Sequence, residues 1–254
     1  MSLSKQVRRG SLIVLEGIDR SGKSTQARLL VSQLSKEFPM ELWRFPDRNL
    51  PSGRQIDDYL TSRQEMDHMH IHNLFALNRQ EKKSALLELL SAGTTVLVDR
   101  YAYSGVAYTA AKGFDIELCK RPDAGLPRPD LIIYFELSPE RASQRGEYGS
   151  ERYERMDFQQ KVAQMYHRLA ADETDIWRTV NADRPVDVIA KEVYQLSKSV
   201  ILQAKSDQSL AVLDWDSDHV TSPAAKIPLA TNTAQTANQM GSHDSCLGSP
   251  VKVK

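Results

Sequence analysis

Short apolar runs alternate with longer amphipathic stretches between residues 11 and 203 of the chain. Most of the runs are rich in Leu, Ile and Val and are bounded by polar or turn-forming residues, which is typical of buried parallel strands. We expect five such strands: Ser11–Glu16, Glu41–Phe45, Thr94–Val98, Asp130–Leu137 and Trp177–Asn181.

Apolar residues at helical spacing occupy the intervals between these runs and predict amphipathic helices. The expected helices are 24–38, 65–92, 157–171 and 185–203, with a further one that begins after Ser138. Ser138 is a favourable N-cap, and Gly93 suits the end of the long helix. Strands separated by helices form right-handed crossovers and a parallel sheet. We therefore expect an α/β fold, a five-stranded parallel sheet flanked by helices, in one domain of residues 1–204.

The composition changes after residue 204. Trp215 is the only aromatic residue from there to the end, and the stretch is rich in Ser, Thr, Ala, Asp, Asn, Gln and Pro without sustained periodicity. Such a segment buries too little apolar surface to offset the entropy of the chain. We expect residues 205–254 to form a disordered tail. A short docking segment at Leu210–Trp215 is the alternative.

Composition and charge narrow the class of partners. The chain has 254 residues, with 33 Lys and Arg against 33 Asp and Glu, so its net charge is zero. A neutral balance argues against a protein whose main role is to bind nucleic acid or an anionic membrane. Two cysteines, Cys119 and Cys246, cannot form a disulfide framework. We expect a cytoplasmic protein with neither nucleic-acid nor membrane partners, and the nucleus and mitochondrion stay open as further compartments.

The most specific motif follows the first expected strand. Residues 17–25 match the pattern G-x-x-x-x-G-K-[ST] of a phosphate-binding loop. Glycines let backbone N–H groups converge on phosphate oxygens, and the following helix adds the positive end of its dipole. Lys23 supplies a charge for the β- and γ-phosphates, and the Ser24 hydroxyl is placed to coordinate Mg²⁺. We expect nucleoside triphosphate to bind this loop: Gly17, Ile18, Asp19, Arg20, Ser21, Gly22, Lys23, Ser24 and Thr25.

The interior of the loop indicates a small phosphotransferase. No N-K-x-D segment for guanine recognition occurs, and the chain is short for a motor or transporter ATPase. Arg20 can stabilise charge on a transferring phosphoryl group, an effect of about 10³–10⁵ in rate where it is known. Asp19 repels a triphosphate, so it is better suited to accept a hydrogen bond from a hydroxyl of the acceptor substrate.

Five further motifs follow the loop in order. Together with it, they make the chain resemble the thymidylate kinase family, in particular the eukaryotic type, which has a basic residue inside the loop, as Arg20 is here. The resemblance covers roughly residues 10–198. It implies the P-loop NTPase fold with a short lid, and phosphorylation of dTMP to dTDP with ATP and Mg²⁺. The motifs are Phe45–Arg48, Phe75–Arg79, Asp99–Tyr101, Gly125–Asp130 and Glu151–Glu154.

The resemblance assigns the acceptor site. It implies that Arg48 binds the dTMP phosphate beside Phe45, that Phe75 stacks on thymine and that Arg79 donates to a base carbonyl. Phe75 and Arg79 share a helix face, but this spacing alone is equally typical of a core Phe and a solvated Arg. Tyr108 and Tyr153 resemble the tyrosines that crowd the sugar, and Gln159 resembles an acceptor-site glutamine.

Two other segments complete the expected site. Asp99 ends an apolar strand, as a carboxylate that acts on Mg²⁺ directly or through water should, with Ser24 as the other candidate ligand. Arg100 suits a bridge between donor and acceptor phosphates. A charge pair that only caps the strand is the alternative. The charged stretch 145–155 predicts a mobile lid, whose candidate residues are Arg145, Glu151 and Arg152. By resemblance, the ATP site also includes Arg145, and the adenine border includes Asn181 and Arg184.

Two alternative functions and the assembly stay open. A deoxynucleoside kinase shares the fold, but it usually lacks the Asp-Arg pair of the loop and accepts an unphosphorylated sugar. A catalytically inactive nucleotide-binding protein would be expected to lack Lys23, Asp99 or the arginines, and all are present. The resemblance also implies a homodimer through the helical surface of residues 65–92.

Overall fold

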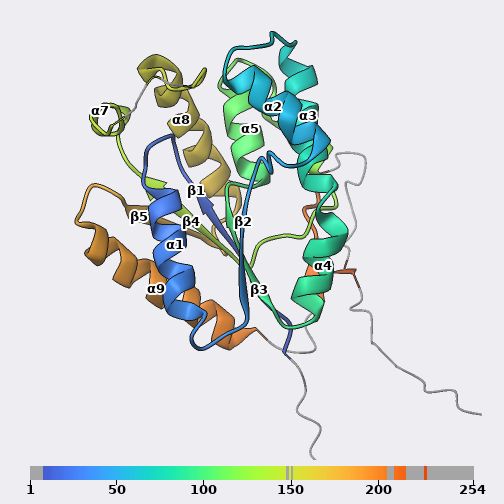
Figure 1. The fold of residues 1–254 in the computed structure, drawn as a ribbon, viewed down its shortest axis with the longest axis vertical. Coiled ribbons are helices and arrows are strands. Elements are labelled where there is room, and N and C mark those ends of the chain that lie inside the picture. Colours follow the sequence, from blue (N-terminus) through green and yellow to red (C-terminus); the bar gives the residue numbers. More distant parts are fainter. Residues whose placement is uncertain (1–7, 147–148, 150, 205–208, 216–225, 228–254) are drawn as a thin grey trace, which may run out of the picture.

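The computed structural model describes residues 8–146, 149, 151–204, 209–215 and 226–227 (Figure 1). Its central sheet has five parallel strands in the order β2-β3-β1-β4-β5. Every predicted strand is confirmed to within one residue at each end. Short apolar runs beside turn residues mark the buried strands β1, β3 and β4 locally, whereas the edge strands β2 and β5 are partly exposed. The strands are β1 Leu12–Glu16, β2 Met40–Arg44, β3 Thr95–Asp99, β4 Leu131–Glu136 and β5 Trp177–Asn181.

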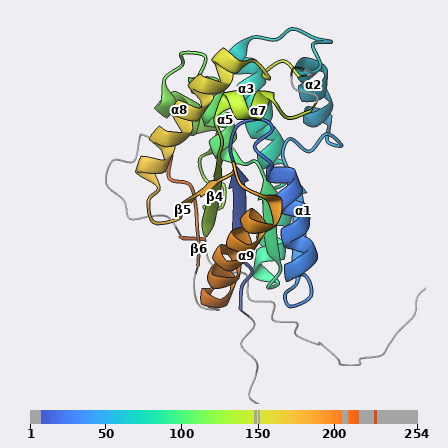
Figure 2. The same ribbon diagram turned by 90° about the vertical axis from the view of Figure 1, so that its left-hand side faces the viewer.

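Helices cover both faces of the sheet (Figures 1 and 2). Helices α1 (Lys23–Leu34) and α9 (Val186–Gln203) pack on each other over one face. Helix α4 (Lys83–Ser91) packs against β3, and α5 (Ala102–Ala110) packs against α8 (Met156–Asp172), on the other side. The α/β class and the parallel sheet are therefore as expected. In the described ranges, no helix combines the length and the apolar character that a membrane crossing requires.

The expected long helix 65–92 is two helices. Helix α3 (His68–Gln80) packs on α2 (Pro51–Leu60) and α5, and the chain then turns at residues 81–82 into α4. Asp67, not a residue further upstream, caps α3, with its carboxylate accepting from the N–H groups of Met69 and His70. No Gly or Pro marks the turn, so the local pattern could not predict it. Helices that the sequence analysis missed are α2 Pro51–Leu60, α5 Ala102–Ala110, α6 Ile116–Lys120 and the 3-10 turn Arg121–Asp123.

Residues beyond the predicted domain boundary at 204 pack on the domain. Residues 209–215, here called the strap, pair with the 125–128 loop: Gly125 N–H donates to the Leu213 carbonyl at 2.9 Å, and Leu213 N–H donates to the Leu126 carbonyl at 2.8 Å. Leu210 and Leu213 are 2% and 1% exposed, and β6 (Leu210–Ala211) pairs with β7 (Lys226–Ile227). The docking alternative was therefore the correct one for the strap. Apart from the strap and β7, the predicted disordered tail lies outside the described residues.

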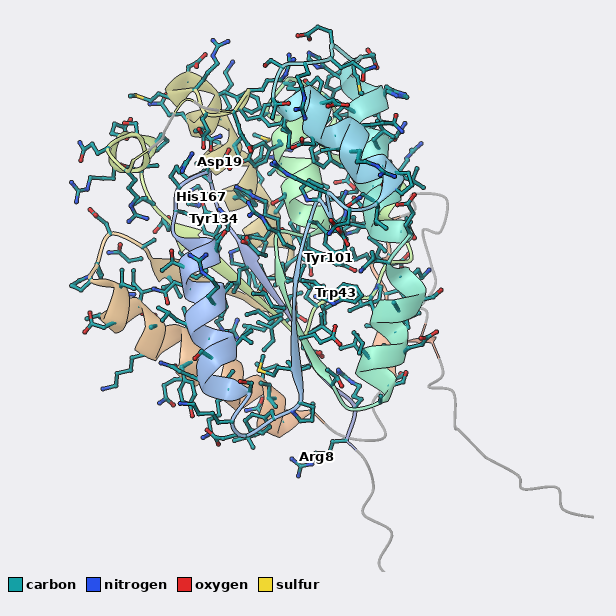
Figure 3. The ribbon with its side chains drawn as sticks, viewed as in Figure 1. Arg8, Asp19, Trp43, Tyr101, Tyr134 and His167 are labelled. Atoms are coloured by element: carbon teal, nitrogen blue, oxygen red, sulfur yellow. The ribbon has the colours of Figure 1, made fainter. Side chains whose placement is uncertain are left out.

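Helix α7 (Pro139–Ser143) begins as expected, since the Ser138 hydroxyl accepts from Arg141 N–H at 3.2 Å. All parallel strands point their carboxyl ends to the same edge of the sheet. Figure 3 shows Asp19 at this edge and Arg8 at the opposite end of the molecule. Helices α2, α3, α5, α7 and α8 gather around the same edge (Figure 1), which is where an α/β sheet binds ligands.

Candidate active site

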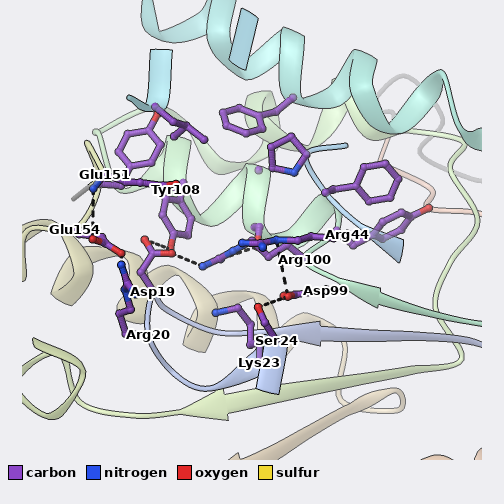
Figure 4. Close-up of a pocket in the computed structure, with 18 of the residues that line it drawn as sticks. Asp19, Arg20, Lys23, Ser24, Arg44, Asp99, Arg100, Tyr108, Glu151 and Glu154 are labelled. Atoms are coloured by element: carbon purple, nitrogen blue, oxygen red, sulfur yellow. Dashed lines mark hydrogen bonds and ion pairs between the residues drawn. The ribbon is translucent and has the colours of Figure 1, made fainter. Parts of the chain in front are cut away.

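A cavity of about 480 Å³ opens at the carboxyl edge of the sheet (Figure 4). Its volume lies in the range of small-molecule sites. The phosphate loop forms one part of its wall, and aromatic side chains on α3 and α5 form another. Most of the predicted site residues line it: Asp19, Arg20, Gly22, Lys23, Ser24, Thr25, Phe45, Arg48, Phe75, Arg79, Asp99, Arg100, Tyr108, Arg145, Glu151 and Tyr153.

The phosphate loop has the backbone that its glycines predict. Gly17 and Gly22 have positive φ of 146° and 101°, which glycine adopts without strain. Lys23 folds back over the loop, and its Nζ donates to the Ile18 carbonyl at 2.6 Å and to the Ser21 hydroxyl at 3.2 Å. Burial, with a further contribution from the Arg100 charge, lowers the pKa of Lys23 to about 7. The lysine is therefore held inside the loop and ready to gain charge when an anion binds.

Asp19 is the centre of a hydrogen-bond network. Its carboxylate forms an ion pair with Arg100 and accepts from the Tyr108 hydroxyl at 2.9 Å and from Gln159 Nε2 at 2.7 Å. Burial acts to raise the pKa of Asp19, but Arg100, Lys23 and these donors together hold the pKa below its ordinary value. The predicted residues Arg100, Tyr108 and Gln159 thus come together, and they meet around Asp19.

The expected metal ligands are adjacent. Ser24 Oγ donates to Asp99 Oδ2 at 2.5 Å, and the Arg44 guanidinium lies 4.0 Å from the same carboxylate (Figure 4). Ser24 begins α1 and Asp99 ends β3, so the order of the strands in the sheet brings them together. A hydroxyl and a carboxylate are hard oxygen ligands of the kind that Mg²⁺ takes.

The predicted base-reading arginine is held by a partner that the sequence analysis missed. Arg79 donates two hydrogen bonds of 2.7 Å to Asp123, whose side chain is 0% exposed. A bidentate pair fixes the plane of the guanidinium, while Arg79 still lines the cavity. Phe75, one turn earlier on α3, lines it as well and is only half-buried. Both residues therefore line the cavity.

The segment 145–155 lies over the phosphate loop. Arg145 donates to the Arg20 carbonyl and the Ala182 carbonyl, each at 2.8 Å. Arg20 Nε donates to Glu154 at 2.7 Å. The predicted lid residue Glu151 pairs with Arg48 at 2.8 Å. The described part of the segment is therefore connected by hydrogen bonds and ion pairs to the phosphate loop and to Arg48.

Comparisons with known proteins identify the family of the chain. A family model described as "Thymidylate kinase" matches residues 15–193. The chain is 48% identical over 210 residues to "Thymidylate kinase" of Arabidopsis thaliana, which covers 82% of this chain and 78% of that protein. It is 43% identical over 199 residues to "Thymidylate kinase" of Homo sapiens, and the match covers 78% of this chain and 94% of that protein. The chain belongs to the thymidylate kinase family.

A solved structure of the same family extends the likeness to three dimensions. The thymidylate kinase of Candida albicans superposes with a TM-score of 0.74 at 34% identity, over 81% of this chain and 98% of that one. The P-loop fold of the thymidylate kinases, expected from the motif, is therefore the fold of this chain.

Seven of the predicted site residues do not line the cavity. Gly17, Ile18 and Ser21 belong to the phosphate loop, and Gln159 donates to Asp19. The other three, Arg152, Asn181 and Arg184, are held by other parts of the chain. Arg152 turns to α2, where it donates to the Tyr59 carbonyl at 2.9 Å and pairs with Glu65. Asn181 accepts from Asp183 N–H at 2.8 Å, and Arg184 forms an ion pair with Glu192. Glu65 and Glu192 compete for these arginines locally, and the residue pattern of a single segment does not reveal such partners.

Several groups in this thymidylate kinase site were missed. Glu154 belongs to a recognised motif but received no role, although it is the partner of Arg20. Asp123 precedes the Gly125–Asp130 motif and gave no signal of its own. Glu16 is a charged residue at the end of an otherwise apolar strand and is fully buried. A carboxylate in that position was a signal that the sequence analysis could have used, because buried acids are rare unless they have partners.

Proposed function

We propose that the protein transfers the γ-phosphoryl group of ATP to the phosphate of dTMP, giving ADP and dTDP, as a nucleoside-monophosphate kinase in dTTP biosynthesis. Membership of the thymidylate kinase family supports this activity. The observation that carries it is that one cavity joins the phosphate loop to an acceptor pocket with Phe45, Phe75 and Arg79 in its wall.

Charge neutralisation and positioning account for the reaction. The dTMP phosphate is already ionised at neutral pH, so no strong general base is needed. Lys23 and Arg20 reach the donor phosphates from the loop, and Arg100 stands between the donor and acceptor sides, beside Asp19. These cations stabilise the charge that spreads over the transferring phosphoryl group while both substrates are held in line.

A metal ion completes the donor site in this proposal. The adjacent hydroxyl of Ser24 and carboxylate of Asp99 fit Mg²⁺, which prefers such oxygen ligands and keeps several waters. When bound with ATP, Mg²⁺ would neutralise charge on the β- and γ-phosphates. The role of the chain is to hold Ser24 and Asp99 next to each other at the base of the loop.

The remaining residues divide between the two substrates. On the acceptor side, Arg48 binds the phosphate of dTMP, Phe75 stacks on thymine and Arg79 donates to a base carbonyl. Tyr108 and Tyr153 crowd the sugar, and Gln159 acts through Asp19, to which it donates. On the donor side, the 181–184 segment borders adenine, and Arg145 ties this segment to the loop through the Ala182 carbonyl.

Lid closure and assembly belong to the same proposal. Arg145 and Glu151 hold the lid over the cavity, where it excludes the water that would otherwise hydrolyse ATP. A homodimer through the α3 surface is supported by Leu77, a large apolar side chain that is 47% exposed. Light scattering after size-exclusion chromatography would test the dimer.

A coupled ADP-release assay with Mg²⁺ and ATP tests the activity. The acceptors compared are dTMP, dUMP, the ribose form of TMP, and thymidine. Strong turnover of dTMP with weak turnover of thymidine is expected. Preference for thymidine would indicate a deoxynucleoside kinase, and ATP binding without turnover of any acceptor would indicate an inactive nucleotide-binding protein.

Discrimination against dUMP should be real but limited. Thymine differs from uracil by one methyl group, and an apolar pocket distinguishes such a group by about 1–3 kcal/mol, or about 10–200-fold in kcat/KM. We expect dUMP to be phosphorylated with kcat/KM lower by that factor. Equal values for the two acceptors would contradict the assignment of Phe75 and its neighbours to the base pocket.

Binding of ATP should take up a proton at alkaline pH. With its pKa lowered to about 7, Lys23 is mostly neutral in the free protein at pH 8. Phosphate oxygens favour the ammonium form, so the lysine gains its proton on binding, and uptake should fall below pH 7, where it is already charged. Calorimetric titration at pH 8 in two buffers of different ionisation enthalpy measures this uptake. The Lys23→Met variant should show none, and a wild-type titration without buffer dependence would contradict the prediction.

A further inference from the structure

The buried carboxylate of Glu16 is linked to Arg100 through the Ser104 hydroxyl. Glu16 is the last residue of β1, immediately before the phosphate loop, and it is 0% exposed. Burial raises the pKa of Glu16 above its ordinary value, against the opposing effect of its hydrogen-bond donors and of the Arg100 charge. A buried acid of this kind destabilises the fold unless it is fully hydrogen-bonded, so its partners show what it is used for.

The partners of Glu16 belong to the segment that carries Arg100. Glu16 Oε1 accepts from the backbone N–H groups of Tyr101, at 2.9 Å, and Ser104, at 3.1 Å. These are donors at the beginning of α5 that have no partner within the helix. Glu16 Oε2 accepts from the Ser104 hydroxyl at 2.5 Å and from the Tyr166 hydroxyl at 2.9 Å. The carboxylate therefore caps α5 from a different element of the fold.

A relay of hydrogen bonds connects Glu16 to the guanidinium. Arg100 Nη1 donates to the Ser104 hydroxyl at 3.2 Å, and that hydroxyl donates to Glu16. The same nitrogen donates to the Gly17 carbonyl at 3.1 Å, so Arg100 also contacts the first residue of the phosphate loop. Arg100 has a φ of 70°, a left-handed conformation that a residue other than glycine keeps only when its surroundings hold it.

We infer that Glu16 is a positioning residue for the phosphoryl transfer: it fixes the turn that carries Arg100 relative to the phosphate loop, through the Ser104 hydroxyl and the N-terminus of α5. Because Glu16 ends β1 and Arg100 follows β3, one carboxylate sets the spacing between two loops that must act on the same phosphates. The inference rests on the proposed kinase function.

The Glu16→Gln variant tests this role, because it keeps the shape and one oxygen but removes the charge. Loss of one charge-assisted hydrogen bond corresponds to about ten- to a hundredfold in rate. We expect kcat for dTMP to fall by that factor, while KM for MgATP changes less than about threefold. In an Arg100→Ala background, the same substitution should change kcat by less than about twofold, because its effect passes through Arg100.

Asp130→Asn is the matched control. Asp130 immediately precedes β4, beside the beginning of β1, where its carboxylate accepts from Leu12 N–H at 2.9 Å and pairs with Arg9. This variant should lower the unfolding temperature and leave kcat unchanged. If Glu16→Gln behaves in the same way, or if its effect multiplies with that of Arg100→Ala, the inference is wrong.

Ser104→Ala provides a second route if Glu16→Gln does not fold. It removes the hydroxyl that joins Arg100 to Glu16 and keeps the carboxylate and both backbone hydrogen bonds. A lower kcat that disappears in the Arg100→Ala background supports the inference, and an unchanged kcat overturns it. Turnover of dTMP by the unmodified chain is measured first. Its absence would refute the proposed function, whereas the ratios between variants test the role of Glu16 alone.

Discussion

Replacing Arg20 with alanine is expected to lower kcat by about 10³–10⁵, the range known for arginines that stabilise charge on a transferring phosphoryl group. The KM for MgATP should stay within a few-fold, because Lys23 and the backbone N–H groups of the loop supply most of the ground-state binding. Steady-state kinetics with dTMP at saturating and limiting ATP separate the two constants. A change in KM with kcat preserved would show that Arg20 only binds ATP.

Two controls separate the charge of Arg20 from its structural effects. Arg20 has a φ of 61°, where alanine is strained and glycine is not. Both variants lack the guanidinium, so Arg20→Gly should lose as much activity as Arg20→Ala if the loss comes from the charge and not from backbone strain. Arg20 also pairs with Glu154 at 2.7 Å. Glu154→Gln breaks this pair and keeps the guanidinium, and it should lower kcat by no more than about tenfold. A loss equal to that of Arg20→Ala would assign Arg20 to lid closure instead.

A chain that ends at Ala204 should not keep a stable fold. Leu210 and Leu213 of the strap are buried in the main core, and burial of two leucines contributes about 3–6 kcal/mol. Domains of this kind have a total free energy of unfolding of about 5–15 kcal/mol. We expect the shortened chain to be largely unfolded or aggregated, or to unfold at much lower urea concentration, as measured by circular dichroism.

A chain that ends at Pro228 is the matched control. It keeps every residue that the structure describes and removes only residues 229–254. Its urea midpoint and kcat should equal those of the full chain. If the urea midpoint of the chain that ends at Ala204 equals that of this control, the strap contributes little to stability and the domain boundary lies where the composition changes.

The parts of the active site that could be predicted are those whose motifs can be recognised within one stretch of sequence. The phosphate loop needs a strand before it, glycines within it and a helix after it, and all three are visible in one stretch of sequence. Asp99 and Arg100 follow a run of apolar residues and could be placed at the edge of the sheet for that reason. The partner of each charged group could not be predicted, because Gln159 reaches Asp19 across 140 positions and Tyr166 reaches Glu16 across 150.

The strap shows why composition alone is an incomplete guide. The composition of residues 205–254 is dominated by polar residues, which hides the short apolar segment at 210–215. By itself this segment is too short to bury its own apolar side chains. The 125–128 loop provides the backbone partners, and Tyr103 provides the ring against which Trp215 packs at a centroid distance of 5.1 Å. Whether a short apolar segment is tail or core depends on such a surface, which is made by distant parts of the chain.

The sequence by itself determined the strands, the α/β class, the phosphate loop and the residue types that phosphoryl transfer needs, because these depend on periodicity and on neighbours within a few positions. The tertiary structure decided the order of the strands, the division of the 65–92 helix into α3 and α4, the burial of the strap, and the pairs Arg79–Asp123 and Arg20–Glu154. Each of these depends on which surfaces meet, and that is set by the packing of the whole domain.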